Sequence, residues 1–123
     1  MSIETSNKKS LLIVDDDASL RQMLCWAFDD IGHFTWSAGD SASAIGAVKG
    51  LSFSFALVDL HQPDGDEVTL MKLLGRHTPR LRTALMSAIP AAIDMTRPGR
   101  VPVIEKPVPI LKIDRLFIKA TPE

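Results

Sequence analysis

The chain has 123 residues, of which 46% are hydrophobic, and its formal net charge at pH 7 is −1. This length and composition predict a single globular domain with a hydrophobic core. The balance of charges argues against nucleic acid or a membrane surface as a direct partner. With one cysteine the chain cannot form an internal disulfide, and none of its apolar stretches approaches the ~20 residues that cross a bilayer.

The first part of the chain predicts a strand followed by a helix. Residues 1–10 are polar and lack the apolar centre of a signal peptide, so we expect a flexible lead-in to a cytoplasmic protein. Residues 11–15 form an apolar run that is typical of a parallel strand covered on both faces. Asp17 is placed to cap a helix and Gly32 to end it. Its predicted inward residues are Leu20, Met23, Leu24, Ala27, Phe28 and Ile31.

The next elements are a strand, a helix and a strand. Residues 34–36 predict the second strand, and Asp40 or Ser41 can cap a helix that ends near Gly50. The inward residues of this helix are predicted to be Ala42, Ile45 and Val48. Residues 53–59 predict the third strand. We interpret three side chains of this half as packing groups rather than functional ones, namely Cys25, Trp26 and Trp36.

The second half continues the alternation. Turn residues at 63–66 precede a third helix, with Val68, Leu70, Met71 and Leu74 as its candidate inward residues. Residues 81–87 predict the fourth strand, and the prolines of residues 88–100 favour a fourth helix that is short or irregular. The fifth strand, over 101–104, contains Pro102 and therefore belongs at a sheet edge. The inward stripe of a last helix is Ile110, Ile113, Leu116, Phe117 and Ala120.

Five alternating strands and helices predict a doubly wound α/β domain with a parallel sheet. Charged residues stand where three of its strands end: Asp15 begins an acidic triplet, Asp59 closes the third strand, and Lys106 follows the fifth. Ligands of such sheets bind outside the carboxyl ends of the strands. A carboxylate at the end of a buried strand is costly unless it has a use there. A cluster of carboxylates facing an ammonium group suits a divalent metal and a phosphoryl group.

Four short motifs occur in order along the chain: Val14–Asp17, Asp59 followed by Pro63-Asp64-Gly65, Ser87-Ala88, and Lys106-Pro107. In this respect the chain resembles the receiver domain of two-component response regulators, over residues 11–120. The resemblance implies a five-stranded, CheY-like (flavodoxin-like) sheet with strand order 2-1-3-4-5. It also implies a cis peptide bond between Lys106 and Pro107.

The resemblance implies a role for each site residue. Asp59 matches the aspartate that accepts a phosphoryl group from a phosphohistidine of a sensor kinase. Lys106 matches the lysine that pairs with the acceptor and the phosphoryl group, and Ser87 the hydroxyl that bonds a phosphoryl oxygen. The implied Mg²⁺ ligands are Asp15, Asp16, Asp59 and the main-chain carbonyl of His61. The side chain of His61 is expected to face solvent.

Two positions depart from the family pattern. Val103 stands where an aromatic residue usually takes part in switching, and Glu67 replaces a glycine of the loop after the acceptor. The rival hypothesis is a small metal-dependent phosphatase that uses an aspartyl phosphate. Such enzymes usually carry a second carboxylate two residues after the nucleophile, where this chain has His61, and their cap insertion has no counterpart here.

We therefore expect a phosphoaccepting regulator rather than an enzyme that turns over a substrate. The partners implied by the resemblance are a sensor histidine kinase or phosphotransfer protein, a downstream output domain or protein, and a second copy in a homodimer. The chain carries no DNA-binding motif. A stand-alone regulator and the receiver of a larger protein both fit the sequence.

Overall fold

The computed structural model describes residues 9–61, 67–89 and 101–118. Its strands are β1 (Ser10–Val14), β2 (Phe34–Ala38), β3 (Phe55–Asp59), β4 (Arg82–Ser87) and β5 (Val103–Glu105). Its helices are α1 (Ala18–Asp30), α2 (Ser41–Gly50), α3 (Glu67–His77), α4 (Ile110–Ile113) and the π-helical turn η3 (Asp114–Ile118). In the described residues the predicted order of strands and helices is confirmed, with strand ends that differ by one or two residues from the expected ones.

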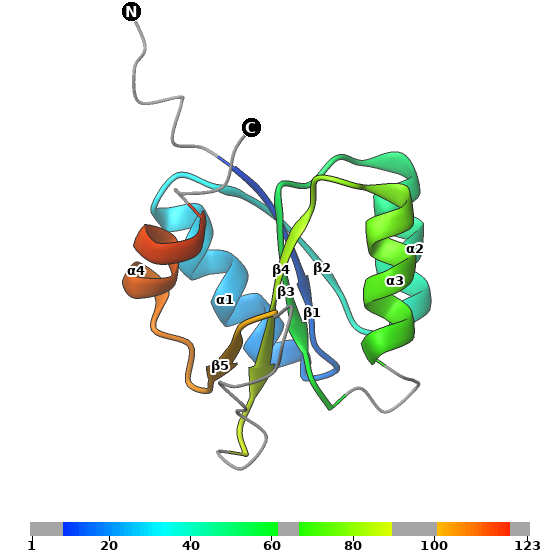
Figure 1. The fold of residues 1–123 in the computed structure, drawn as a ribbon. Helices are drawn as coiled ribbons and strands as arrows, with labels where there is room; N and C mark the ends of the chain where they lie inside the picture. Colours follow the sequence, from blue (N-terminus) through cyan, green and yellow to red (C-terminus); the bar gives the residue numbers. More distant parts are fainter. Residues whose placement is uncertain (1–8, 62–66, 90–100, 119–123) are drawn as a thin grey trace, which may run out of the picture.

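The five strands form one parallel sheet in the order β2-β1-β3-β4-β5. This order confirms the prediction, and β5 lies at an edge as Pro102 required. Helices α1 and α4 cover one face of the sheet, while α2 and α3 cover the other (Figure 1). The carboxyl ends of the strands lie at the lower edge of the view in Figure 1, and the last residue of β3 pairs with Met86 of β4.

The core consists of two layers, one on each face of the sheet. The layer beneath α1 and α4 includes Leu11, Ile13, Leu24 and Phe28. The layer beneath α2 and α3 includes Leu12, Val14, Val48 and Leu74. Alternate residues of β1 therefore enter opposite layers, as expected of a strand that is covered on both faces. This double cover fixes β1 and β3 firmly and thereby the residues at their ends.

Both predicted helix caps are present. The Asp17 carboxylate accepts hydrogen bonds from the backbone N–H groups of Ser19 and Leu20, at 3.0 and 3.1 Å. Asp40 rather than Ser41 caps α2, because its carboxylate accepts from the N–H of Ser43 at 2.7 Å. Gly32 follows α1 with a φ of +103°, a backbone conformation that favours glycine.

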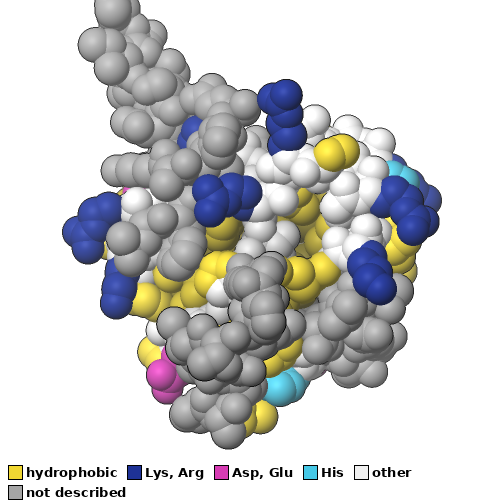
Figure 2. Space-filling model, viewed as in Figure 1, with side chains coloured by type: hydrophobic (Ala, Val, Ile, Leu, Met, Phe, Trp, Pro, Cys, Tyr) yellow, Lys and Arg dark blue, Asp and Glu magenta, His cyan; other side chains and the backbone are white. Residues whose placement is uncertain are grey.

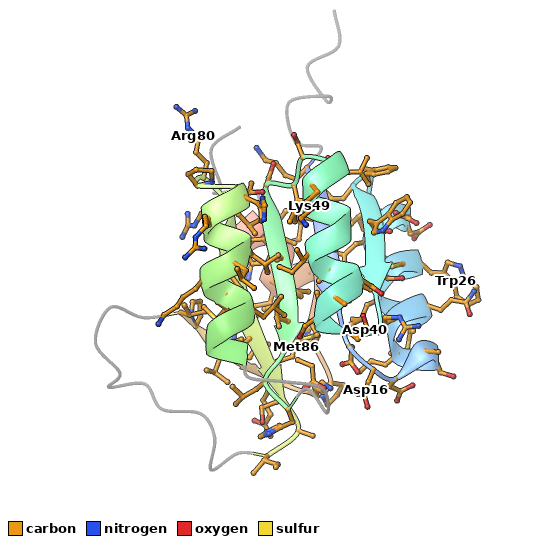
Figure 3. All side chains as sticks on the ribbon, turned by 90° about the vertical axis from the view of Figure 1, so that its right-hand side faces the viewer. Asp16, Trp26, Asp40, Lys49, Arg80 and Met86 are labelled. Carbon is orange, nitrogen blue, oxygen red and sulfur yellow. The ribbon has the colours of Figure 1, made fainter. Side chains whose placement is uncertain are left out.

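Four side chains that were expected to pack inward are exposed instead. Trp26 is 65% exposed, Met23 53% and Trp36 46%, and Ala42 is also exposed. Figure 3 shows Trp26 pointing away from the body of the domain. Cys25 is half-buried against the core, so its interpretation as a packing residue is confirmed only in part.

The exposure of both tryptophans has a geometric cause. Only Leu24 and Phe28 of α1 are fully buried, so the buried stripe of this helix is narrower than its apolar pattern. Trp36 belongs to β2, which has a neighbouring strand on one side only. Periodicity shows which face of an element turns inward, but it does not show how far the neighbouring elements extend over that face.

A buried polar contact joins the beginning of β1 to the end of the described chain. His33 Nε2 lies 2.5 Å from Asp114 Oδ1, and both side chains are nearly inaccessible. The backbone N–H of Lys9 donates to His33 Nδ1 at 3.1 Å. The neutral imidazole therefore carries its proton on Nε2 and donates it to Asp114. No pattern in the sequence indicates this contact.

On the face shown in Figure 2, Lys and Arg side chains are spread around the periphery, with hydrophobic side chains between them. In the part of the chain that the structure describes, none of the helices has the length and apolarity that crossing a membrane requires. The predicted short or irregular fourth helix falls mainly on residues 90–100, outside the described residues.

Candidate functional site

Three charged residues meet at the carboxyl ends of the strands. Asp15 directly follows β1, Asp59 is the last residue of β3, and Lys106 directly follows β5. Asp15 is 1% exposed and Asp59 is 5% exposed. The backbone fixes the two segments that follow the strands. The N–H of Asp15 donates to the carbonyl of Ala38 at 3.1 Å, and that of Lys106 to the carbonyl of Ser87 at 2.8 Å.

Lys106 bridges the two buried carboxylates. Its Nζ lies 2.8 Å from Asp15 Oδ2 and 3.6 Å from Asp59 Oδ1. Burial, the largest single effect, lowers the pKa of Lys106, but the hydrogen bonds and charges of Asp15 and Asp59 outweigh it and raise that pKa above its ordinary value. The ammonium group is therefore held protonated between the carboxylates. The peptide bond between Lys106 and Pro107 is cis, as expected.

Asp16 completes an acidic cluster. One carboxylate oxygen from each of Asp15, Asp16 and Asp59 lies within 4.8 Å of the others, and Asp16 is the exposed member. Its position at the lower end of the sheet is visible in Figure 3. When ionised, three carboxylates exceed the one ammonium group of Lys106 by two negative charges, which matches a divalent cation. Carboxylate oxygens are also the ligands that Mg²⁺ prefers. The donor set therefore fits the metal that the sequence predicted.

A second cation supports the segment after β1 from outside the cluster. Arg21 Nη1 donates to the main-chain carbonyl of Asp15 at 2.7 Å. A Cβ atom at Gly39 would lie 3.0 Å from the same guanidinium nitrogen, so this position favours glycine for reasons of space. Neither residue was predicted from the sequence, because a side chain that bonds a main-chain carbonyl and a glycine that leaves space belong to no motif.

Ser87 lies at the end of β4 and is fully buried. Its hydroxyl accepts from the backbone N–H of Ile89 at 3.0 Å and lies 3.2 Å from the carbonyl of the same residue. His61 Nε2 lies 3.1 Å from the Ser87 Oγ, and the His61 N–H donates to Asp59 Oδ1 at 3.2 Å. His61 is exposed, as expected, but its bond to Ser87 was missed.

The comparisons with known proteins point to one class. No family model matches the chain. The transcriptional regulatory protein FixJ of Bradyrhizobium diazoefficiens is 27% identical over 105 residues, or 83% of this chain. The regulatory protein AtoC of Escherichia coli is 26% identical over 113 residues, or 89% of this chain. The chain spans 51% of the length of the first relative and 24% of the second.

Solved structures show the same fold. A response regulator of Burkholderia pseudomallei, described with a phosphorylated aspartic acid and a calcium ion, has a TM-score of 0.74 at 22% identity, covering 85% of this chain and 64% of that one. A CheY-like receiver domain of Methylobacillus flagellatus has a TM-score of 0.75 at 19% identity, covering 87% and 93%. TrrA of Thermotoga maritima, in complex with Mg²⁺ and beryllofluoride, has a TM-score of 0.61 at 17% identity, covering 68% and 72%.

Fold and sequence relatives agree on the class of this protein. The sheet order and the helices on both faces are those of CheY-like receiver structures. The curated relatives are response regulators. In both fold and sequence the chain is therefore similar to response regulators and their receiver domains.

Proposed function

We propose that the chain is a response regulator receiver domain that accepts a phosphoryl group on Asp59, and that the modification changes a surface read by an output domain or protein. The observation that carries the proposal is the contact of Lys106 with both Asp15 and Asp59 at the carboxyl edge of the sheet. In that contact the Lys106 ammonium lies beside the buried Asp59 carboxylate, where its charge can stabilise a phosphoryl group during transfer. The similar Burkholderia pseudomallei protein, with its phosphorylated aspartic acid, supports the same chemistry.

The proposed donor is a phosphohistidine on a sensor histidine kinase or phosphotransfer protein. An oxygen of the Asp59 carboxylate attacks phosphorus, a new O–P bond forms, and the N–P bond of the donor breaks. The departing imidazole keeps the electron pair and takes a proton from solvent. Asp59 becomes an acyl phosphate, and the donor histidine returns to its free form.

The residues around Asp59 supply positioning and charge, which phosphoryl transfer chiefly requires. The Lys106 ammonium is 3.6 Å from Asp59 Oδ1 and is placed to pair with the oxygens of the transferred group. Asp15, Asp16, Asp59 and the main-chain carbonyl of His61 would hold Mg²⁺, which neutralises the charge of the phosphoryl oxygens when bound. These are the roles that the family resemblance implied for the same residues.

Ser87 is the proposed switch residue. An acyl phosphate adds about −1.5 to −2 charge and strong acceptor oxygens beside it. A hydroxyl that donates to one of those oxygens biases the segment after β4 toward a second arrangement. Val103, which packs half-buried in the layer beneath α2 and α3, has no aromatic ring that could swing together with the Ser87 hydroxyl. We infer that switching here depends more heavily on the Ser87 hydroxyl.

Incubation with acetyl phosphate and Mg²⁺, followed by intact-mass measurement, tests the proposal. One phosphoryl group per chain is expected on the wild type, and none on Asp59→Asn, which keeps the shape of the side chain but lacks the nucleophilic oxygen. Asp30→Asn is the matched control, because Asp30 is exposed at the far end of α1 and should leave labelling unchanged.

Two results would contradict the proposal. Labelling that persists in Asp59→Asn would place the acceptor elsewhere. Multiple turnover of simple phosphate esters by the wild type would favour the rival hypothesis, a small phosphatase that uses an aspartyl phosphate. A regulator, in contrast, should not hydrolyse phosphate esters. With acetyl phosphate it should release phosphate only slowly, through repeated formation and hydrolysis of its own acyl phosphate.

A further inference from the structure

The side chain of His61 has no role in the proposed chemistry, yet it reaches the proposed switch residue. His61 Nε2 lies 3.1 Å from Ser87 Oγ, across 26 positions of sequence. The main chain of the same residue contacts the acceptor, because the His61 N–H donates to Asp59 Oδ1 at 3.2 Å. One residue therefore contacts both Asp59 and Ser87.

The Ser87 hydroxyl has no hydrogen to spare in this arrangement. A serine hydroxyl offers one hydrogen and two lone pairs. The Ile89 N–H occupies one lone pair at 3.0 Å. The hydroxyl hydrogen then points either to the Ile89 carbonyl at 3.2 Å or to His61 Nε2 at 3.1 Å. In the first case the Nε2 hydrogen of His61 fills the remaining lone pair.

Both tautomers of His61 thus oppose a movement of the Ser87 hydroxyl toward a phosphoryl oxygen on Asp59. If Nε2 is the acceptor, it competes for the hydrogen that a phosphoryl oxygen needs. If Nε2 is the donor, it anchors Ser87 Oγ where it lies. Ser87 is fully buried, so little water is present to replace a bond that is given up.

We propose that the His61 side chain is a positioning residue that restrains the Ser87 hydroxyl in its unphosphorylated arrangement and thereby weakens the binding of a phosphoryl group at Asp59. This inference rests on the proposed function. One hydrogen bond within the protein corresponds to a roughly two- to tenfold change in an equilibrium constant. His61 therefore sets how readily the site changes state, while Asp59 and Lys106 carry the chemistry.

Beryllofluoride, a phosphoryl mimic, gives a binding readout that does not depend on transfer. At fixed Mg²⁺, fluorine NMR measures the beryllofluoride concentration that half-saturates each protein. His61→Phe keeps a flat ring but cannot bond Ser87, and its half-saturating concentration should be about two- to tenfold lower than that of the wild type. His61→Gln replaces the imidazole with an amide of similar reach, which can still bond Ser87. Its half-saturating concentration should therefore stay close to that of the wild type.

Two further variants separate positioning from general effects. His77→Phe, at the exposed last residue of α3, is the matched control and should bind like the wild type. In a Ser87→Ala background, His61→Phe should produce no additional change, because the hydroxyl that it releases is gone. Since His61 is exposed, its replacement should leave the fold intact, which circular dichroism verifies.

The outcomes distinguish this inference from the function on which it rests. A wild type that neither binds beryllofluoride nor takes label from acetyl phosphate overturns the proposed function and the inference with it. A wild type that binds, with unchanged or weaker binding in His61→Phe, overturns the inference alone. An equal shift in the presence and absence of the Ser87 hydroxyl does the same.

Discussion

Two buried polar clusters lie at opposite ends of the sheet, and they are built on different principles. At the carboxyl end, Lys106 faces the carboxylates of Asp15 and Asp59, with Asp16 beside them. At the amino end, His33 is bonded on both ring nitrogens, to the Lys9 N–H and to Asp114. The first cluster has two more negative than positive charges when its carboxylates are ionised, whereas in the second each ring nitrogen of His33 has a hydrogen-bond partner.

This difference separates a site that is poised for a ligand from one that only holds the fold. An excess of carboxylates is a source of repulsion that a bound divalent metal can relieve. A saturated histidine–aspartate contact gains nothing from a ligand, but it joins residues that are 81 positions apart. Mutations at the carboxyl end should therefore affect phosphoryl labelling, and mutations at the amino end the free energy of unfolding.

The largest expected effect is the loss of labelling in Asp59→Asn, which should be complete. The same change removes one of several neighbouring negative charges, so the free energy of unfolding should stay the same or rise. Urea titration followed by circular dichroism measures it. Tryptophan fluorescence is a poorer probe here, because Trp26 and Trp36 are already exposed in the folded state. A marked loss of stability would show that Asp59 also holds the fold.

The reverse result is expected at the amino end. His33→Leu removes the hydrogen bond that the buried Asp114 carboxylate accepts from the imidazole, which should lower the free energy of unfolding by about 1–3 kcal/mol. Labelling of the folded protein by acetyl phosphate should be unchanged. His77→Leu, at an exposed histidine, should stay within about 0.5 kcal/mol of the wild type. A loss below about 1 kcal/mol in His33→Leu would contradict the structural role given to this contact.

Binding of Mg²⁺ should raise the free energy of unfolding, and this gain should depend on the cluster at the carboxyl end and not on the one at the amino end. At ten times its dissociation constant, a ligand that binds the folded state alone adds about 1.4 kcal/mol to the free energy of unfolding. We expect this gain in the wild type and in His33→Leu, and a much smaller one in Asp16→Asn, where an exposed ligand is lost. Urea titrations with Mg²⁺ and with EDTA measure the difference. An equal gain in all three proteins would place the metal elsewhere.

The sequence predicted the carboxyl-end cluster because Asp15, Asp59 and Lys106 each end or directly follow a strand, and Asp16 is the next residue after Asp15. The alternation of strands and helices predicted a parallel sheet, which puts Asp15, Asp59 and Lys106 at the same edge. The strand order that makes β1 and β3 neighbours was implied by the family resemblance. The missing N–H of Pro102 located β5 at the edge.

The contacts that the sequence did not predict share a different character. His33 with Asp114 and His61 with Ser87 depend on the reach and rotamer of single side chains, for which no periodic signal exists. The exposure of Trp26 depends on how far the sheet extends beneath α1. Such details are set by packing between distant segments, which an apolar pattern does not encode.

The smallest expected effect concerns alkaline pH and the carboxyl end. Because folding raises the pKa of Lys106, its stabilising contribution is fully present below the pKa of the unfolded chain, roughly 10.4, and is lost as pH rises through the folded value. The chain has no tyrosine, so no phenol titrates in the same range. The free energy of unfolding should therefore fall more steeply with pH above roughly 10.4 in the wild type than in Lys106→Met. Lys49→Met, which removes an exposed lysine of α2, should keep the slope of the wild type. Equal slopes in the wild type and Lys106→Met would mean that the contacts of Lys106 with Asp15 and Asp59 do not favour its charged form.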